Sequence, residues 1–219
     1  MKSIARWPAA VGSLALLAGC SGGGIAPRDA SYEPMPQEAG PVDAGGGDAD
    51  AATVDGAQCA VLIEQHTDEG AYHIACTCPT TYHTVPPSSG NHFGYWPEYR
   101  TFDVPVPWGN LVHALEHGAV VIVYNCGVAG CPDEVARAQE FIDGLPPDPD
   151  CTDHRVILAP DPTLPVRWAA SAWTWTLQAD CFDNAAFTQF YADHYGHGRE
   201  IVCGGGAPYA SLCDGAPCN

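Results

Sequence analysis

The distribution of cysteines constrains the fold of this chain more than any other feature. The sequence holds 11 cysteines, and all except Cys20 fall between residues 59 and 218. An even number of cysteines in an exported chain is typical of a disulfide framework, here with up to five bridges. Short loops between Cys126 and Cys131, and between Cys213 and Cys218, are candidates for local closure. The remaining pairings do not follow from the sequence.

Residues 1–19 predict an export signal of the lipoprotein type. Lys2 and Arg6 give a positive start, and residues 9–17 form an apolar core too short to span a bilayer. The segment ends with Leu-Ala-Gly followed by Cys20, which matches the processing box in which the cysteine becomes the lipid-modified, palmitoylated N-terminus. We therefore expect lipidation at Cys20 and anchoring of the protein to a membrane through that lipid.

The segment that follows, residues 20–57, predicts a flexible acidic tether of Gly, Ala and Asp. It lacks aromatic or β-branched periodicity and carries seven acids against the single base Arg28. Such a segment cannot bury enough apolar surface to offset its ordering entropy. We expect it to hold a domain away from the surface of a cell-envelope membrane, facing the periplasm or the exterior. Ser21 in place of Asp after the lipidated cysteine favours the outer membrane.

Residues 58–219 have the length of a single globular domain. The whole chain has 26 acidic residues against 8 basic ones and a formal net charge of −18. This balance argues against nucleic acid as a partner and against direct binding to anionic lipid. It is compatible with cations as ligands, although solubility at an exposed cell surface explains it more simply. No feature identifies a protein partner.

The apolar pattern of the domain predicts an α+β fold. The run 119–124 fits a strand buried on both faces, and runs at 155–159 and 166–177 predict further strands, the last with a bulge or bend near 170–172. Helices are expected over 132–145 and after Asp183. The simplest arrangement is a small mixed sheet with helices packed on one face, stapled by disulfides.

One histidine-rich run suggests chemistry. In Val112-His113-Ala114-Leu115-Glu116-His117-Gly118, a helix would place His113 and His117 four residues apart on one face, within reach of one metal ion. The upstream segment 83–92 is rich in Pro and Gly and carries a histidine at each end. We predict a transition-metal site of copper or zinc with the ligands His92, His113 and His117, supported by Glu116 and His83. His66, His73 and His154 are expected to be ordinary surface residues.

Three interpretations of this run remain open. Its histidines can be metal ligands with Glu116 as a ligand or an orienting acceptor; the run can be the H-x-x-E-H motif of a metal-dependent hydrolase with Glu116 as general base; or the histidines can be a structural hydrogen-bond network. Gly118 ends the helix after barely two turns, which is short for a peptidase site. The third interpretation corresponds to a disulfide-stabilised interaction module. The pattern does not decide whether a bound metal would activate water or oxygen.

Four segments together resemble a bacterial family of exported domains. They are Pro86-Pro87-Ser88-Ser89-Gly90-Asn91-His92, Val104-Pro105-Val106-Pro107, the run 112–118 with its apolar strand, and Val156-Ile157-Leu158-Ala159-Pro160. The family is known as domain-of-unknown-function family 3105, with the pattern P-P-[TS]-S-G-x-H followed by V-H-x-L-E-H-G. The resemblance runs from about Tyr82 to Glu200. It implies a shared fold and a shared site at His92, His113, Glu116 and His117, and it implies no activity.

Overall fold

The computed structural model describes residues 59–152 and 154–213. The predicted export signal, the predicted lipidation site Cys20, the predicted tether and Cys218 lie outside these residues. In the part of the chain that is described, no helix combines the length and the apolar character that crossing a bilayer requires.

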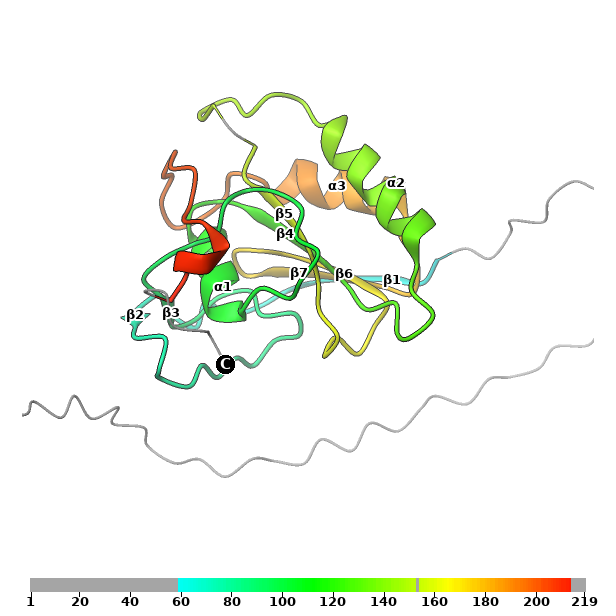
Figure 1. Cartoon of the computed structure of the whole chain (residues 1–219). Helices are drawn as coiled ribbons and strands as arrows, with labels where there is room; N and C mark the ends of the chain where they lie inside the picture. Colours follow the sequence, from blue (N-terminus) through cyan, green and yellow to red (C-terminus); the bar gives the residue numbers. More distant parts are fainter. Residues whose placement is uncertain (1–58, 153, 214–219) are drawn as a thin grey trace, which may run out of the picture. The chain divides into compact units, whose positions relative to one another are not determined.

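A five-stranded mixed sheet forms the centre of the domain (Figure 1). Strands β4 and β5 run parallel, and every other neighbouring pair is antiparallel. The spatial order is β1-β7-β6-β4-β5. In chain order the strands are β1 (Val61–Gln65), β4 (Val120–Tyr124), β5 (Val156–Pro160), β6 (Trp168–Ala172) and β7 (Trp175–Ala179). The α+β class and the mixed sheet predicted from the sequence are confirmed.

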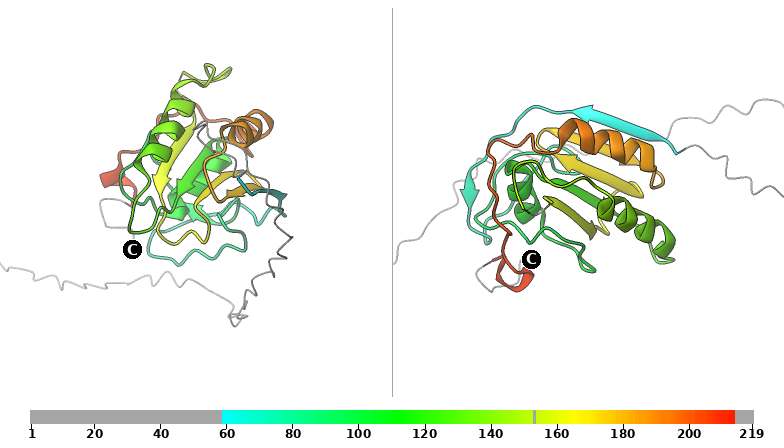
Figure 2. Two further views of the ribbon diagram at one scale, coloured as in Figure 1. Left: turned by 90° about the vertical axis from the view of Figure 1, so that its right-hand side faces the viewer. Right: turned by 90° about the horizontal axis from the view of Figure 1, so that it is seen from above.

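Three helices cover the two faces of this sheet: α1 (Trp108–Glu116), α2 (Pro132–Asp143) and α3 (Asn184–His194). Because side chains alternate along β4, Val120 and Ile122 join the core beneath α2 and α3, whereas Val121 and Val123 join the core beneath α1. The ribbons in Figures 1 and 2 show α2 and α3 together on one side of the sheet and α1 apart from them. The two helices predicted from apolar periodicity therefore share one face, and the short histidine-bearing helix lies on the opposite face.

The predicted helix boundaries follow from local chemistry. Pro132 occupies the start of α2, where its missing N–H costs no hydrogen bond. The side chain of Asp183 caps α3 by accepting from the backbone N–H of Ala186 at 2.8 Å. Both helices begin where the sequence predicts.

The predicted single strand over 166–177 is wrong in one respect. The switch of side-chain parity is produced by a hairpin turn at Trp173 and Thr174 between β6 and β7, and not by a bulge or bend at 170–172 within one strand. Ala172 pairs with Trp175, so the chain reverses over two residues, with Thr174 at a φ of +62°. A reversal changes which residues face each side of the sheet just as a bulge does, so the pattern alone did not separate them.

A second, two-stranded sheet lies beside α1 and positions the candidate site. Strand β2 (His73–Ile74) pairs in parallel with β3 (His92–Phe93). The aromatic ring of Phe93 packs against Gly109 in the first turn of α1, where a Cβ would lie 2.5 Å from the ring. The absence of a side chain at Gly109 therefore allows β3 to approach the helix closely. The 3-10 helix η1 (Tyr209–Ser211) follows near the end of the described chain.

Four disulfides join the described residues: Cys59–Cys181, Cys76–Cys213, Cys126–Cys131 and Cys151–Cys203. Cys126 and Cys131 close the expected short loop. Cys213 bonds Cys76, so it does not close a loop with Cys218 as expected. The pairing of Cys213 with Cys218 was expected because they are close in sequence. Tertiary packing instead brings Cys76 and Cys213 together, at a Cα–Cα distance of 5.6 Å.

Candidate metal centre

Helix α1 holds three of the predicted site residues, His113, Glu116 and His117, at its C-terminal end. The helix starts after Pro107 and stops at His117, and Gly118 has a φ of +81° that side-chain-bearing residues rarely adopt. All three residues are buried. Glu116 and His117 follow His113 by three and four positions, so each lies next to it, but their directions around the helix axis differ by about 100°.

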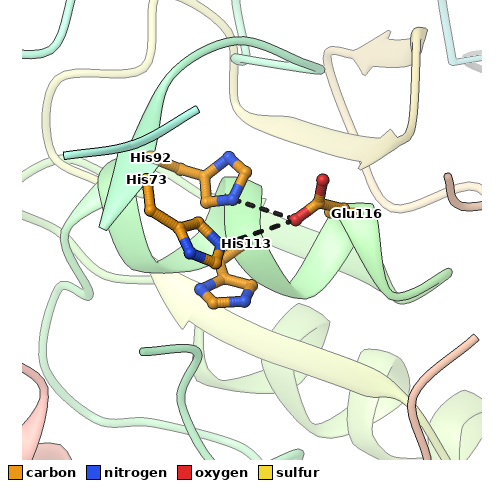
Figure 3. A group of neighbouring side chains, drawn as sticks. All are labelled: His73, His92, His113 and Glu116. Carbon is orange, nitrogen blue, oxygen red and sulfur yellow. Dashed lines mark ion pairs between the residues drawn. The ribbon is translucent and has the colours of Figure 1, made fainter. Parts of the chain in front are cut away.

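The register of β2 and β3 supplies two further imidazoles. His73 pairs with His92, and directly paired residues in a sheet project from the same face. Their ring centroids lie 4.9 Å apart, and each ring lies within 5 Å of the His113 ring, at 4.6 Å from His73 and 4.8 Å from His92. Figure 3 shows the three imidazoles and the Glu116 carboxylate directed toward one another.

These four residues form a compact donor group, which we call the histidine–glutamate group: His73, His92, His113 and Glu116. Each offers one ligand atom, and the four atoms lie within 4.8 Å of one another. Glu116 Oε2 lies 3.0 Å from His92 Nε2 and 3.8 Å from His73 Nε2. His92 and His113 are buried, while the side chain of His73 is 55% exposed, so solvent reaches the group from the side of β2.

Two backbone carbonyls determine which ring nitrogens face the group. His92 Nδ1 lies 2.9 Å from the carbonyl oxygen of Gly90, and His113 Nδ1 lies 2.7 Å from that of Phe93. Because a carbonyl oxygen only accepts, each Nδ1 carries the proton and donates it. In the neutral rings the lone pair is therefore on Nε2. This is the arrangement in which backbone acceptors orient metal-binding imidazoles.

Burial keeps these imidazoles neutral. Loss of hydration, followed by repulsion from His92, lowers the pKa of His113 from 6.5 to about 3. Burial also lowers the pKa of His92, although its bond to Gly90 and the Glu116 carboxylate oppose the shift. Two lone-pair-bearing atoms, His92 Nε2 and Glu116 Oε2, thus face each other at 3.0 Å. Such a contact is favourable when a proton or a metal cation is shared between them.

His117 lies outside the histidine–glutamate group although the sequence predicted it as a ligand. Its ring centroid is 4.7 Å from that of His113 and 4.5 Å from that of Trp96, against which it packs edge-on. Neither ring nitrogen has a hydrogen-bond partner among the described residues, and Nδ1 lies 3.4 Å from Glu200 Oε1. Burial lowers the pKa of His117, against the opposing effect of Glu200.

The structure places His83 outside the histidine–glutamate group. Its side chain is 79% exposed, and its Nδ1 lies 3.0 Å from Glu69 Oε2 at the surface. The neighbouring residue Tyr82 instead contacts the backbone just before β3, donating its hydroxyl hydrogen to the carbonyl of Asn91. His83 is therefore close to His92 in sequence, but its side chain lies at the surface, away from the group.

His73, which the sequence predicted to be a surface residue, is exposed as expected, and the structure also places it in the histidine–glutamate group, which does not contain His83. No periodic pattern could reveal it, because β2 contains only two residues. It becomes part of the group through pairing with β3, which is a tertiary contact. Of the five predicted residues, the structure brings together His92, His113 and Glu116. The grouping also differs from the H-x-x-E-H interpretation. In that motif His113 and His117 would both bind the metal, and Glu116 would act as the general base.

The segment 196–204 covers the C-terminal end of α1. The Gly196 N–H donates to the Gly118 carbonyl at 2.9 Å, and the Glu200 N–H donates to the Glu116 carbonyl at 3.1 Å. Between them, a Cβ at Gly198 would lie 2.2 Å from the Glu116 carbonyl oxygen. We call this segment the strap. It fixes the helix end that carries Glu116 and His117, and the disulfide Cys151–Cys203 fastens it to the rest of the domain.

A buried ion pair also supports this helix end. Arg155 donates to the His117 carbonyl and pairs with Asp148 at 2.9 Å. Burial raises the pKa of Asp148, but bonds from Tyr195, Asp150, Arg155 and Cys151 outweigh it and lower that pKa to about 2. A guanidinium at a helix C-terminus also interacts favourably with the negative end of the helix dipole. The site is therefore held by a charged network that itself lies in the interior.

Comparison with known proteins gives one match. The family model described as "Protein of unknown function (DUF3105)" matches residues 73–204. No curated protein and no solved structure matches the chain. The matched residues begin at His73, include the whole histidine–glutamate group and extend through the strap. They also contain the segment over which the sequence resembles this family. The chain belongs to the DUF3105 family of proteins of unknown function.

Proposed function

We propose that this chain is a cell-envelope lipoprotein whose domain binds a transition metal ion, copper or zinc, through His73, His92, His113 and Glu116. The observation that carries the proposal is the convergence of three imidazoles and one carboxylate, with their ligand atoms within 4.8 Å of one another. These residues come from three separate elements, β2, β3 and α1. Two of the imidazoles are buried in the domain.

The spacing of the donor atoms supports an ion at this point. Bonds of about 2 Å to one ion in a tetrahedral site place neighbouring ligand atoms roughly 3.3 Å apart. The separations of 3.0 Å and 3.8 Å from Glu116 Oε2 to the two Nε2 atoms bracket that value. A cation would also remove the repulsion between the lone pairs of His92 Nε2 and Glu116 Oε2. Small side-chain movements would complete the coordination.

The donor set supports copper or zinc. Neutral imidazoles suit zinc, copper, iron and nickel, while a carboxylate adds a charged oxygen ligand. The group contains no thiolate, which disfavours a site specialised for copper(I). The exposed side of His73 leaves room for a water or another small ligand to reach the ion. The chain's own residues would bind and orient the ion and keep most of the site dry.

Placement in the envelope is part of the proposal. Four disulfides among the described residues suit an oxidising compartment outside the cytoplasm. The processing box that ends at Cys20 would supply the lipid anchor, with Ser21 favouring the outer membrane. Expression of the chain and its Cys20→Ala variant, followed by mass analysis and membrane fractionation, tests this part. An acylated, membrane-bound chain that becomes unacylated and soluble in the variant is the expected result; no difference would contradict it.

Metal content provides the direct test of binding. The full chain, purified without a histidine tag and equilibrated with Cu²⁺ or Zn²⁺, should retain about one tightly held ion at the histidine–glutamate group after gel filtration. The variant His92→Ala/His113→Ala should lose that ion, whereas His83→Ala, which removes an exposed histidine outside the group, should keep it. Equal retention by the double variant and the wild type, or negligible retention by all three, would refute the proposal.

A structural histidine network within an interaction module is the alternative. The bonds of His92 and His113 to backbone carbonyls favour it, because they stabilise the fold without any ion. It predicts that His113→Ala lowers the melting temperature by the same amount with and without a chelator. The metal proposal predicts instead that chelator lowers the melting temperature of the wild type and has little effect on His113→Ala. Differential scanning calorimetry distinguishes the two.

A further inference from the structure

His117 is a buried imidazole that the histidine–glutamate group does not use. The residue is 2% exposed, and both of its ring nitrogens lack a hydrogen-bond partner among the described residues. Buried polar groups in folded proteins almost always have a partner, because they lose their hydrogen bonds to water. The rings of Trp96 and His113 fix its orientation at centroid distances of 4.5 Å and 4.7 Å. An unpartnered, immobilised imidazole of this kind points to a ligand.

The carboxylate of Glu200 is the charged group that faces this ring. Glu200 Oε1 lies 3.4 Å from His117 Nδ1, which is longer than a hydrogen bond between the two. The position of Glu200 is set by its own backbone bond to the Glu116 carbonyl and by the close contact at Gly198. The strap thus presents one carboxylate beside one imidazole, in a fixed relation to the end of α1.

A pocket lies beside Glu200. Its volume is about 390 Å³, and Glu116 and Glu200 both line it, together with Tyr72 and Arg199. The Arg199 guanidinium lies 3.8 Å from Asp68, which balances its charge. Glu200 is 56% exposed on the solvent side. Because Arg199 is paired with Asp68, the two carboxylates leave this lining with a negative charge, which favours a cation over an anion.

We propose that His117 and Glu200 hold a second divalent transition-metal cation, beside the pocket that Glu116 also lines. Imidazole and carboxylate are a suitable pair for such an ion, and water from the pocket would complete the coordination. With two side chains of its own, this position is weaker than the histidine–glutamate group. The inference rests on the proposed function only through the shared Glu116; its own evidence is the unpartnered His117 and the carboxylate placed beside it.

Titration with Zn²⁺ tests the second position. The full chain, stripped of metal and purified without a histidine tag, is titrated by calorimetry and by competition with a chromophoric chelator. The wild type should bind two equivalents of different affinity. Glu200→Gln should weaken the lower-affinity equivalent at least about tenfold and leave the tighter one unchanged. Glu140→Gln, which neutralises an exposed carboxylate on α2, is the matched control and should match the wild type. His117→Gln, checked for folding by circular dichroism, should reproduce Glu200→Gln.

The remaining outcomes separate this inference from the proposed function. One equivalent in the wild type that Glu200→Gln leaves unchanged overturns the second position and leaves the histidine–glutamate group standing. Two equivalents that persist in Glu200→Gln also overturn it, as does a single equivalent lost in every site variant. One equivalent that survives in His92→Ala/His113→Ala but is lost in Glu200→Gln supports the second position and refutes the proposed function. No binding at all overturns both.

Discussion

His73 lies directly opposite His92 in the parallel register of β2 and β3, with the two ring centroids 4.9 Å apart. A shift of this register by one residue would place Ile74 opposite His92 and turn one imidazole to the other face of the sheet. The pairing of two very short strands thus decides whether the histidine–glutamate group exists. Its stability depends on β3 packing against α1 through Phe93 and Gly109.

Replacing His73 with alanine should weaken metal binding without unfolding the protein. Its side chain is half-exposed, so truncation removes a ligand but little core packing. We expect the affinity for Zn²⁺ or Cu²⁺ to fall by at least about tenfold. Chelator competition measures this, with His83→Ala as the control for loss of an exposed histidine. An affinity for His73→Ala equal to that of His83→Ala would show that His73 is not a ligand.

The metal-free protein should lose stability as the pH falls below about 6.5, the pKa of an unfolded histidine. Burial lowers the pKa of His113 to about 3 and also lowers those of His92 and His117. Below pH 6.5 the unfolded chain therefore binds protons that the folded chain does not, and the free energy of unfolding decreases until the pH reaches the folded pKa values.

Each such histidine contributes a slope of up to about 1.4 kcal/mol per pH unit. Urea unfolding of chelator-treated protein between pH 7 and pH 4 measures the combined change in the free energy of unfolding. His113→Gln should show a shallower dependence than the wild type over this range. A wild-type stability that stays constant from pH 7 to pH 4 would contradict neutral, buried imidazoles.

Asp148→Asn should destabilise the domain strongly. It leaves the buried Arg155 guanidinium without its charged partner, and breaking a buried ion pair on one side typically costs about 3–5 kcal/mol. The loss should also loosen the end of α1, where Arg155 donates to the His117 carbonyl. Asp193→Asn, on the exposed side of α3, should change the unfolding free energy by about 0.5 kcal/mol or less. Similar urea midpoints for both variants would show that the pair contributes little.

Gly198→Ala should disturb the strap and the helix end together. The added methyl group would lie 2.2 Å from the Glu116 carbonyl oxygen and 2.3 Å from the Gly118 nitrogen, so the strap must move away. We expect a cost of roughly 1–3 kcal/mol in unfolding free energy and weaker binding at any site that uses Glu116 or Glu200. Gly94→Ala is the control, since a Cβ there has no neighbour within 4 Å. Thermal melts in which the two variants coincide would argue against close packing of the strap.

Part of the fold follows from local patterns in the sequence. Three local features predicted their elements correctly: the buried run of β4, the proline at the start of α2 and the Asp183 cap of α3. Each depends only on residues that are close to it in sequence. The hairpin between β6 and β7 was mistaken for a bulge because both features change side-chain parity. Strand β1 has no alternating burial, with all five residues exposed, and therefore gave no pattern.

The sequence by itself determined that a histidine-bearing helix of two turns would end at Gly118 and that His113 and Glu116 would lie on adjacent positions of its surface, because helix geometry fixes these relations within one segment. Only the tertiary structure decided which other imidazoles complete the group. The choice of His73 over His83, the separation of His117, and the bond from Cys76 to Cys213 all depend on contacts between segments distant in the chain. Such contacts arise from packing of the whole domain, and no short-range pattern of residues encodes them.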